Sequence, residues 1–230
     1  MAFLIIIFFM VVSMIVGAAL KSKFTQYSKI PLRSGLSGKE VAEKMLRDNG
    51  IYDVQVTCVP GHLSDHYNPA NKTVNLSPEV YEGRHIAAAA IAAHECGHAV
   101  QHATAYPFLQ FRSAMVPVVH FSSQVINVIF IASLFGAFAF HWLNIQTALL
   151  VVIIAQAAIT LFSLITLPVE FNATSRGLAW LNGTGLTHGE EHKKATKALS
   201  LAATTYVIAA LSSLTLLLYY ILMFLGARRD

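Results

Sequence analysis

Charged residues are scarce in this sequence. Asp, Glu, Lys and Arg make up 12% of its 230 residues and apolar residues make up 55%, whereas a soluble domain carries about 25% charged residues. The mean hydropathy of +0.57 agrees with this bias. The composition excludes a disordered chain, a protein that coats nucleic acid and a simple cytosolic globule. It predicts a membrane protein whose partner is the lipid bilayer.

Residues 1–20 contain no Asp, Glu, Lys or Arg, and neither do the 57 residues from 113 to 169. A turn at 141–146 would divide the second stretch, and Pro168 would close it. The first stretch could instead be a signal peptide, but it lacks a basic start and exceeds the roughly 7–15 apolar residues of such segments. Because about 20 apolar residues cross a bilayer, we expect four spans, at residues 2–20, about 115–140, about 147–167 and about 201–225.

The basic residues indicate how these spans are oriented. Ten of the 16 lie in residues 21–112, four in residues 168–200 and two in the tail at Arg228–Arg229. Two spans separate the first two segments, so both lie on one side of the membrane, which the positive-inside rule identifies as the cytoplasm. The tail departs from this rule. We expect a multi-pass protein of the cell (inner or plasma) membrane with no nucleic-acid partner; the sequence carries no indication of oligomeric state.

Residues 21–112 are predicted to form a small α/β insertion between the first and second spans. A capping box at Ser37–Glu40 marks the start of one helix, and Gly50 marks its end. Alternation of apolar and polar residues indicates strands. The expected elements are a helix at 38–49, strands at 54–58 and 72–76, a turn-rich segment at 60–69 and an alanine-rich helix at about 84–104.

The alanine-rich helix contains the motif His94-Glu95-Cys96-Gly97-His98, an H-E-x-x-H pattern. Two histidines four residues apart project from one helical face, close enough to bind a single zinc ion. Glu95 is rotated by about 100° from His94, beside the metal, where it can take a proton from zinc-bound water. The alternative is a chance match in a helix with several histidines.

A catalytic zinc needs a third protein ligand and one open position. A third histidine six residues after His98 would complete a known pattern, but that position is Thr104. His102 shares the face of His98, yet it lies about 12 Å along the axis from His94. Glu170, the first acid after the charge-free stretch, is the better candidate, because an acid at the end of a span is costly without a partner. The alternative for Glu170 is an interfacial carboxylate among lipid headgroups.

The residues that follow Glu170 favour a ligand. If the third span continues as a helix, Ala173, Thr174 and Gly177 share the face of Glu170. These small residues would let the H-E-x-x-H helix approach closely. Arg176 lies off that face and could pair with acidic residues or with headgroups.

Four segments occur in order along the chain: Leu63-Ser64-Asp65-His66-Tyr67-Asn68-Pro69, Leu76-Ser77-Pro78-Glu79-Val80-Tyr81, Ala92-Ala93-His94-Glu95-Cys96-Gly97-His98-Ala99-Val100-Gln101 and Pro168-Val169-Glu170-Phe171-Asn172-Ala173. In these segments the chain resembles the YugP-type membrane neutral zinc metallopeptidases of bacteria, and the resemblance covers most of its length. It implies one Zn²⁺ per chain, with His94, His98 and Glu170 as ligands and Glu95 as catalytic acid/base. A more distant likeness to the HtpX and Ste24 membrane peptidases, which use H-E-x-x-H and a later E-x-x-A-D, implies the same third ligand.

The chain departs from these patterns near the third ligand. An aspartate often follows the ligand glutamate by two in the YugP-type pattern, where this chain has Asn172. The aspartate of the HtpX pattern aligns with Thr174. Neither carboxylate would be available to orient a ligand histidine or to bind Arg176. His102 also stands where a shorter polar residue is expected.

Several other residues are candidates for roles near the site. His66 and Tyr67 could stabilise the oxyanion of a tetrahedral intermediate, or they could be turn residues fixed by Asp65 and Asn68. One of the two expected strands could offer an edge to an extended peptide. Cys58 and Cys96 are the only cysteines; we expect reduced thiols, with Cys96 pointing from its helix into the core.

The sequence therefore leads to one hypothesis and two rivals. The hypothesis is a mainly α, integral-membrane zinc endopeptidase that cleaves membrane-associated or misfolded polypeptides at the cytoplasmic surface. A site-2-type intramembrane protease would carry an L-D-G motif, which the sequence lacks. A zinc-stabilised membrane scaffold would have no use for Glu95. The expected organisation is a first span at 2–20, a zincin-like domain at 21–112, two spans at 113–167, a cytoplasmic segment with the third ligand at 168–200 and a last span at 201–225.

Overall fold

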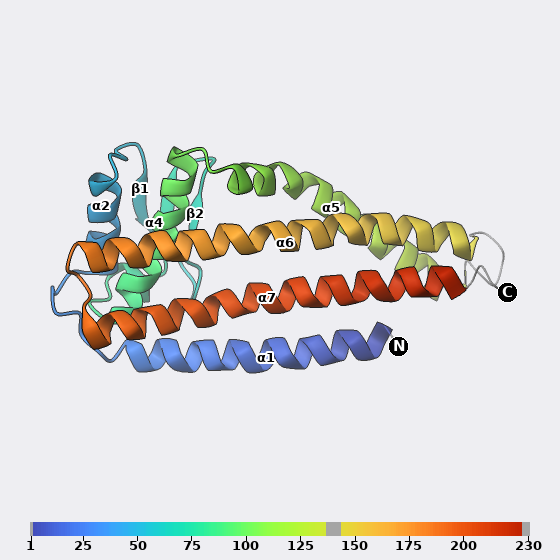
Figure 1. Ribbon diagram of the computed structural model, residues 1–230, viewed down its shortest axis with the longest axis horizontal. Helices are drawn as coiled ribbons and strands as arrows, with labels where there is room; N and C mark the ends of the chain where they lie inside the picture. The colour runs from blue at the N-terminus through green and yellow to red at the C-terminus, as the bar shows by residue number, and fades with distance from the viewer. Residues whose placement is uncertain (1, 137–143, 227–230) are drawn as a thin grey trace. The chain divides into compact units, whose positions relative to one another are not determined.

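A computed structural model describes residues 2–136 and 144–226 of the chain. The fold is mainly α, with a small three-stranded sheet inserted between the first two long helices, as the sequence predicts (Figure 1). Part of the expected turn at 141–146 and the Arg228–Arg229 tail lie outside the described residues. In chain order the elements are α1 (Ala2–Tyr27), α2 (Gly38–Asp48), β1 (Gln55–Cys58), β2 (His66–Asn68), β3 (Thr73–Leu76), α3 (Pro78–Tyr81), α4 (Ile86–Ala103), α5 (Pro107–Leu134), α6 (Ile145–Gly183) and α7 (Gly189–Gly226).

Four of the described helices, α1, α5, α6 and α7, are long and apolar enough to cross a membrane. Pro168 does not end its helix, because α6 continues unbroken through it to Gly183 (Figure 1). Proline removes one backbone hydrogen bond but keeps a helical φ, and membrane helices tolerate this loss. The continuation places Glu170 on a regular helix.

The chain divides into two compact units. One contains residues 14–110 and 168–205, with the whole sheet; the other contains the more apolar parts of α1, α5, α6 and α7. In the apolar unit, Gln156 and Thr160 of α6 are buried and hydrogen-bonded to Ser213 of α7. Such polar contacts stabilise helix pairs in lipid by about 0.6 kcal/mol each.

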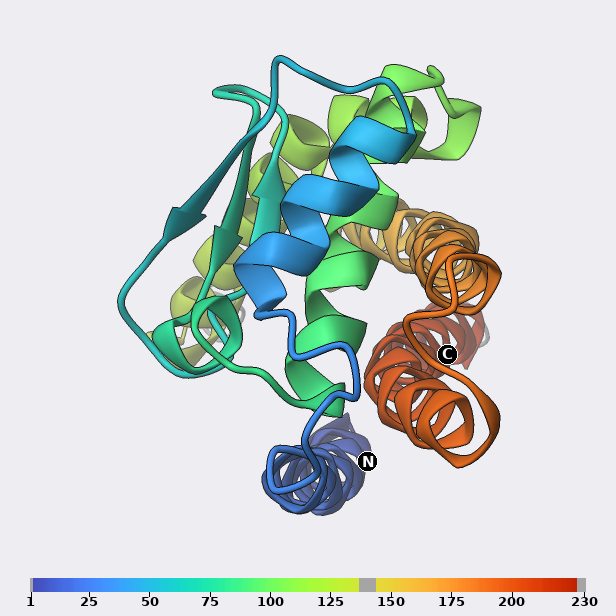
Figure 2. The ribbon, with the colours of Figure 1, turned by 90° about the vertical axis from the view of Figure 1, so that its left-hand side faces the viewer.

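The sheet has the order β1-β3-β2, with β1 parallel and β2 antiparallel to β3. The two predicted strands are present as β1 and β3, but β3 is central, so it offers no free edge to a peptide. The turn-rich segment contains an unpredicted third strand, β2, whose residue His66 pairs with Asn75. Helices α2 and α4 cover the same face of the sheet (Figure 2).

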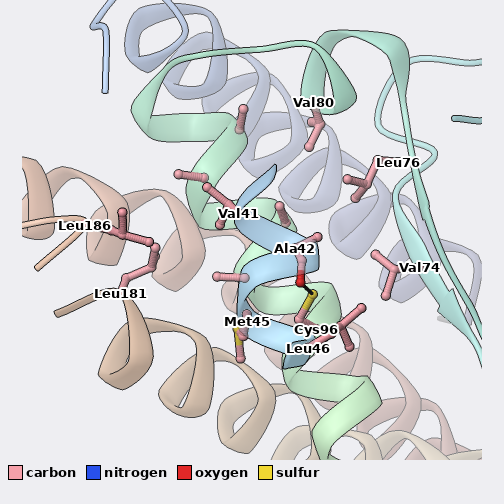
Figure 3. Close-up of a cluster of buried hydrophobic side chains, with 14 of the residues drawn as sticks. Val41, Ala42, Met45, Leu46, Val74, Leu76, Val80, Cys96, Leu181 and Leu186 are labelled. Carbon is pink, nitrogen blue, oxygen red and sulfur yellow. Dashed lines mark hydrogen bonds between the residues drawn. The ribbon is translucent and has the colours of Figure 1, made fainter. Parts of the chain in front are cut away.

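Helix α2 begins at the predicted capping box, in which Ser37 and Glu40 each bond the other's backbone N–H, and Gly50 follows its end with a φ of +71°. Its apolar face is buried mainly against α4, with side chains of β3 in the same core (Figure 3). Burying each large aliphatic side chain contributes about 1.5–3 kcal/mol. This core fixes α4, because the Cys96 thiol of α4 contacts the Ala42 carbonyl at 3.6 Å. The labelled core residues are Val41, Ala42, Met45, Leu46, Val74, Leu76, Val80, Cys96, Leu181 and Leu186.

Candidate metal centre

Two helices supply the side chains of the candidate centre. Helix α4 carries His94 and His98, and α6 carries Glu170. Alanine, the residue with the highest helix propensity, fills the first half of α4 and is almost completely buried there. The small methyl groups let neighbouring elements approach the α4 backbone.

The approach of α4 to α6 requires residues that are small. A Cβ on Gly97 of α4 would lie 2.4 Å from the Ala173 carbonyl oxygen of α6, and a Cβ on Gly177 of α6 would lie 2.8 Å from the Ala93 carbonyl oxygen of α4. No real Cβ occupies such a position. The expectation that the face of Glu170 admits the H-E-x-x-H helix is confirmed.

The potential ligand atoms converge on one point. The Glu170 Oε2 atom lies 3.4 Å from His94 Nε2 and 3.5 Å from His98 Nε2, and one ligand atom from each of the three residues falls within 4.8 Å of the others. Tetrahedral zinc with bonds of about 2.0–2.1 Å separates its ligand atoms by about 3.3 Å. The two N-to-O distances therefore fit zinc, and an imidazole–carboxylate set suits its chemistry.

The site is buried, which raises the electrostatic importance of each contact. Glu170 is 2% exposed and His98 is 8% exposed. Burial lowers the pKa of the His98 imidazole, but the carboxylates of Glu170 and Glu95 outweigh this and raise it above its ordinary value. The carboxylates thus give the pocket a strong preference for positive charge at its centre.

Each histidine uses its second ring nitrogen in a hydrogen bond to a neutral side chain. The distance from His98 Nδ1 to Gln101 Oε1 is 3.0 Å, and that from His94 Nδ1 to Thr174 Oγ1 is 3.1 Å. The missing carboxylate at position 174 therefore does not leave its histidine unsupported. Gln101 is not among the site residues predicted from the sequence; the signal that could have indicated it is a glutamine one turn after a candidate ligand histidine.

Asn172 performs the accepting role that an aspartate would have at that position. Its Oδ1 atom accepts hydrogen bonds from Arg176 Nε at 2.8 Å and from Gln101 Nε2 at 3.0 Å. Arg176 therefore contacts Asn172 on its own helix. The departure from the YugP-type pattern exchanges a charged acceptor for a neutral one.

Glu95 lies beside the two histidines and is held by the sheet. It is 8% exposed, and its Oε2 atom accepts the backbone N–H of Tyr67 at 3.0 Å. The Tyr67 hydroxyl lies 2.7 Å from His102 Nδ1, which explains the longer side chain at position 102. Burial raises the pKa of the Tyr67 hydroxyl, so it remains protonated at neutral pH.

His66 lies on the other face of the sheet. Neighbouring strand residues point to opposite faces, and Tyr67 points toward His102 of α4. The His66 ring donates from Nδ1 to the Ser64 carbonyl at 2.8 Å and contacts Asn75 through Nε2 at 3.1 Å. The structure thus brings Tyr67, but not His66, to the candidate centre.

The alternative explanation of this pair as turn residues does not match the contacts. The Asp65 carboxylate accepts from the backbone and hydroxyl of Ser77, and the Asn68 amide accepts from the backbone of Ala70. Asp65 and Asn68 therefore stabilise the approach to β2 and the turn after it.

Comparisons with known proteins agree with this geometry. Residues 2–225 match the family described as "Putative neutral zinc metallopeptidase". Over 210 residues, the chain is 44% identical to a protein of Bacillus subtilis (strain 168) named "Putative membrane protease YugP", and the match covers 91% of this chain and 90% of that protein. No solved structure matches the chain significantly.

Proposed function

The chain belongs to the neutral zinc metallopeptidase family, and from this premise we propose that it is an integral-membrane endopeptidase with its active site at His94, His98 and Glu170. The observation that carries the proposal is the convergence of the two imidazole Nε2 atoms and one carboxylate oxygen from α4 and α6. Helix α4 is not among the four candidate spans, which argues against a site-2-type intramembrane protease.

His94, His98 and Glu170 would hold one zinc ion. When bound, zinc supplies a Lewis acid that polarises a peptide carbonyl and lowers the pKa of water. The fourth position must stay open for the reaction. The two neutral partners, Gln101 and Thr174, orient the imidazoles and leave the net charge of the ligand set at one negative unit.

Glu95 would move the proton. With its Oε2 atom fixed by the Tyr67 N–H, the carboxylate can accept a proton from the attacking water as the new C–O bond forms. It would then deliver the proton to the nitrogen of the scissile bond, which leaves as an amine when the C–N bond breaks. A glutamine at position 95 could not accept this proton.

Tyr67 would stabilise the oxyanion of the tetrahedral intermediate. Its hydroxyl is protonated, lies on the α4 side of the sheet and is oriented by His102. A donor fixed before the reaction begins stabilises developing negative charge without reorganisation. The contacts of His66 favour a structural role in β2 instead.

The substrates we propose are polypeptides at or near the bilayer, including membrane-associated and misfolded proteins. Glu170 directly follows 57 residues without a charged side chain, so the third ligand comes from the edge of a membrane helix. The excess of basic residues in 21–112 and 168–200 supports a site on the cytoplasmic side.

The test compares purified wild-type protein with Glu95→Gln, using casein and a membrane protein as substrates and measuring bound zinc in both. We expect cleavage to fall by at least about 10²–10⁴-fold, the contribution of a general base, with zinc retained. Glu43→Gln, on the surface of α2, is the matched control. Unchanged cleavage in Glu95→Gln would contradict the mechanism, and zinc binding by a wild type that cleaves neither substrate would indicate a scaffold.

A further inference from the structure

Gln101 is a fully buried polar residue whose side-chain amide contacts three other residues. It is 0% exposed and lies one turn after His98 on α4. Its Oε1 atom is 3.0 Å from His98 Nδ1, and its Nε2 atom is 2.7 Å from the Val169 carbonyl oxygen and 3.0 Å from Asn172 Oδ1. A buried amide with this many partners is strongly fixed.

The orientation of the amide follows from the chemistry of its partners. The Val169 carbonyl can only accept, so the NH₂ group of Gln101 must face it. Asn172 Oδ1 is an acceptor as well, because its other partner, Arg176 Nε, can only donate. The amide oxygen of Gln101 therefore faces His98.

This orientation determines where the His98 proton resides. An amide oxygen accepts only, so His98 Nδ1 must carry a hydrogen; in the neutral ring the lone pair is then on Nε2, which faces Glu170. The hydroxyl of Thr174 beside His94 Nδ1 can either donate or accept, so it imposes no such choice. Gln101 thus fixes which nitrogen of His98 carries the hydrogen, whereas Thr174 does not fix this for His94.

The same amide links both halves of the candidate centre. Val169 directly precedes Glu170 in α6, so the bond from Gln101 fixes the α6 backbone next to the carboxylate ligand. A carboxylate at position 101 would oppose the Val169 carbonyl and carry a buried charge. Only a neutral side chain with a donor and an acceptor satisfies all three contacts.

We propose that Gln101 is a positioning residue for the zinc site: it holds His98 in the Nδ1–H tautomer and sets the distance between His98 and Glu170. The inference rests on the proposed zinc ligands. It identifies a residue that touches neither metal nor substrate but prepares two of the three ligand atoms. Thr174 contacts only His94, so we expect it to have a similar but smaller effect on zinc binding.

The first experiment measures zinc affinity by competition with a chelator. Gln101→Met keeps the length of the side chain and removes its hydrogen bonds; we expect about 10–100-fold weaker zinc binding, the usual effect of losing such a partner. Thr174→Val should weaken it less. Gln156→Met is the matched control, because it removes another buried glutamine, one that contacts Ser213, and should leave zinc affinity unchanged. Affinity within twofold of wild type in a folded Gln101→Met protein would overturn the proposal.

The second experiment uses wild-type protein and so does not depend on a variant that folds. Nitrogen-15 NMR of histidine-labelled, metal-free protein, at a pH where the ring is neutral, reports which nitrogen of His98 carries hydrogen. We expect Nδ1–H for His98, and a mixture in Gln101→Met. Hydrogen on Nε2 in the wild type would refute the tautomer assignment. Neither experiment requires substrate, so absence of peptidase activity would count against the proposed function alone.

Discussion

At the scale of single residues, charge is concentrated on a few buried groups whose partners are neutral. Glu170 and Glu95 supply negative charge. Gln101 and Thr174 contact the two histidines, and Asn172 contacts Gln101, without adding any charge. An additional buried carboxylate would need its own compensation. The candidate site therefore keeps its preference for a cation with few buried charges.

Replacing Glu170 by glutamine should remove zinc from the protein. The amide keeps the shape of the side chain but lacks the negative charge. We therefore expect zinc affinity to fall by more than the about 10–100-fold that follows loss of a hydrogen-bond partner of a ligand. Zinc per chain, measured by elemental analysis after dialysis against a weak chelator, gives the answer. Glu79→Gln, in an exposed glutamate, is the control; stoichiometric zinc in Glu170→Gln would exclude this residue as a ligand.

Replacing Tyr67 by phenylalanine should slow catalysis and leave zinc in place. Removal of one oxyanion donor lowers kcat by about 10²–10³-fold, whereas the backbone N–H that holds Glu95 is kept. Steady-state kinetics and zinc content measure the two effects separately. Tyr52→Phe, at an 81% exposed tyrosine, should match wild type. A change in KM with kcat unaltered would mean that Tyr67 binds substrate instead.

At the scale of elements, the separation of two helices decides whether the ligands meet. Gly97 on α4 and Gly177 on α6 each face the partner's backbone. Glu170 lies one and two turns before Ala173 and Gly177 on the same face, so the contact that brings the backbones together also brings the carboxylate to the histidines. The geometry of the candidate site therefore depends on how closely α4 and α6 approach each other.

Gly97→Ala should push the two helices apart. The added methyl would lie 2.4 Å from the Ala173 carbonyl oxygen, and overpacking of this kind costs about 1–3 kcal/mol. The midpoint temperature of thermal unfolding in detergent and the zinc content should both decrease. Gly183→Ala is the control, since a Cβ there meets nothing within 4 Å. Normal zinc content and unchanged stability in Gly97→Ala would show that the helices can adjust.

At the scale of the whole molecule, one chain combines apolar helices long enough to cross a membrane with a compact unit that carries the candidate metal centre. Helix α6 runs from the charge-free stretch through Glu170 to Gly183 without a break, so a single element carries both a candidate membrane span and a candidate metal ligand. Under the proposed function, this continuity would keep the candidate site close to the bilayer and would favour polypeptides found there as substrates.

The two native cysteines allow the orientation to be tested by chemical labelling. Cys58 is exposed, whereas Cys96 is buried and its burial raises the pKa of the thiol, so only Cys58 should react with a membrane-impermeant maleimide. We expect labelling in inverted membrane vesicles and protection in right-side-out vesicles. Cys58→Ser should abolish the signal. The reverse pattern would place the zinc site outside the cell.

The sequence by itself determined the apolar helices, the capping box of α2 and the H-E-x-x-H helix, because hydropathy, caps and i, i+4 spacing are local properties of the chain. It also identified Glu170 as the candidate for a third ligand, from its place at the end of the charge-free stretch. Only the tertiary structure decided that β2 forms inside a turn-rich segment, that α6 passes through Pro168, and that Tyr67 rather than His66 reaches Glu95. It also decided that Gln101 joins His98 to α6. These features depend on strand pairing and on the contact between α4 and α6. In that contact, Gln101 bonds to Val169, which is 68 residues later in the chain, and no local sequence pattern encodes a contact between residues so far apart.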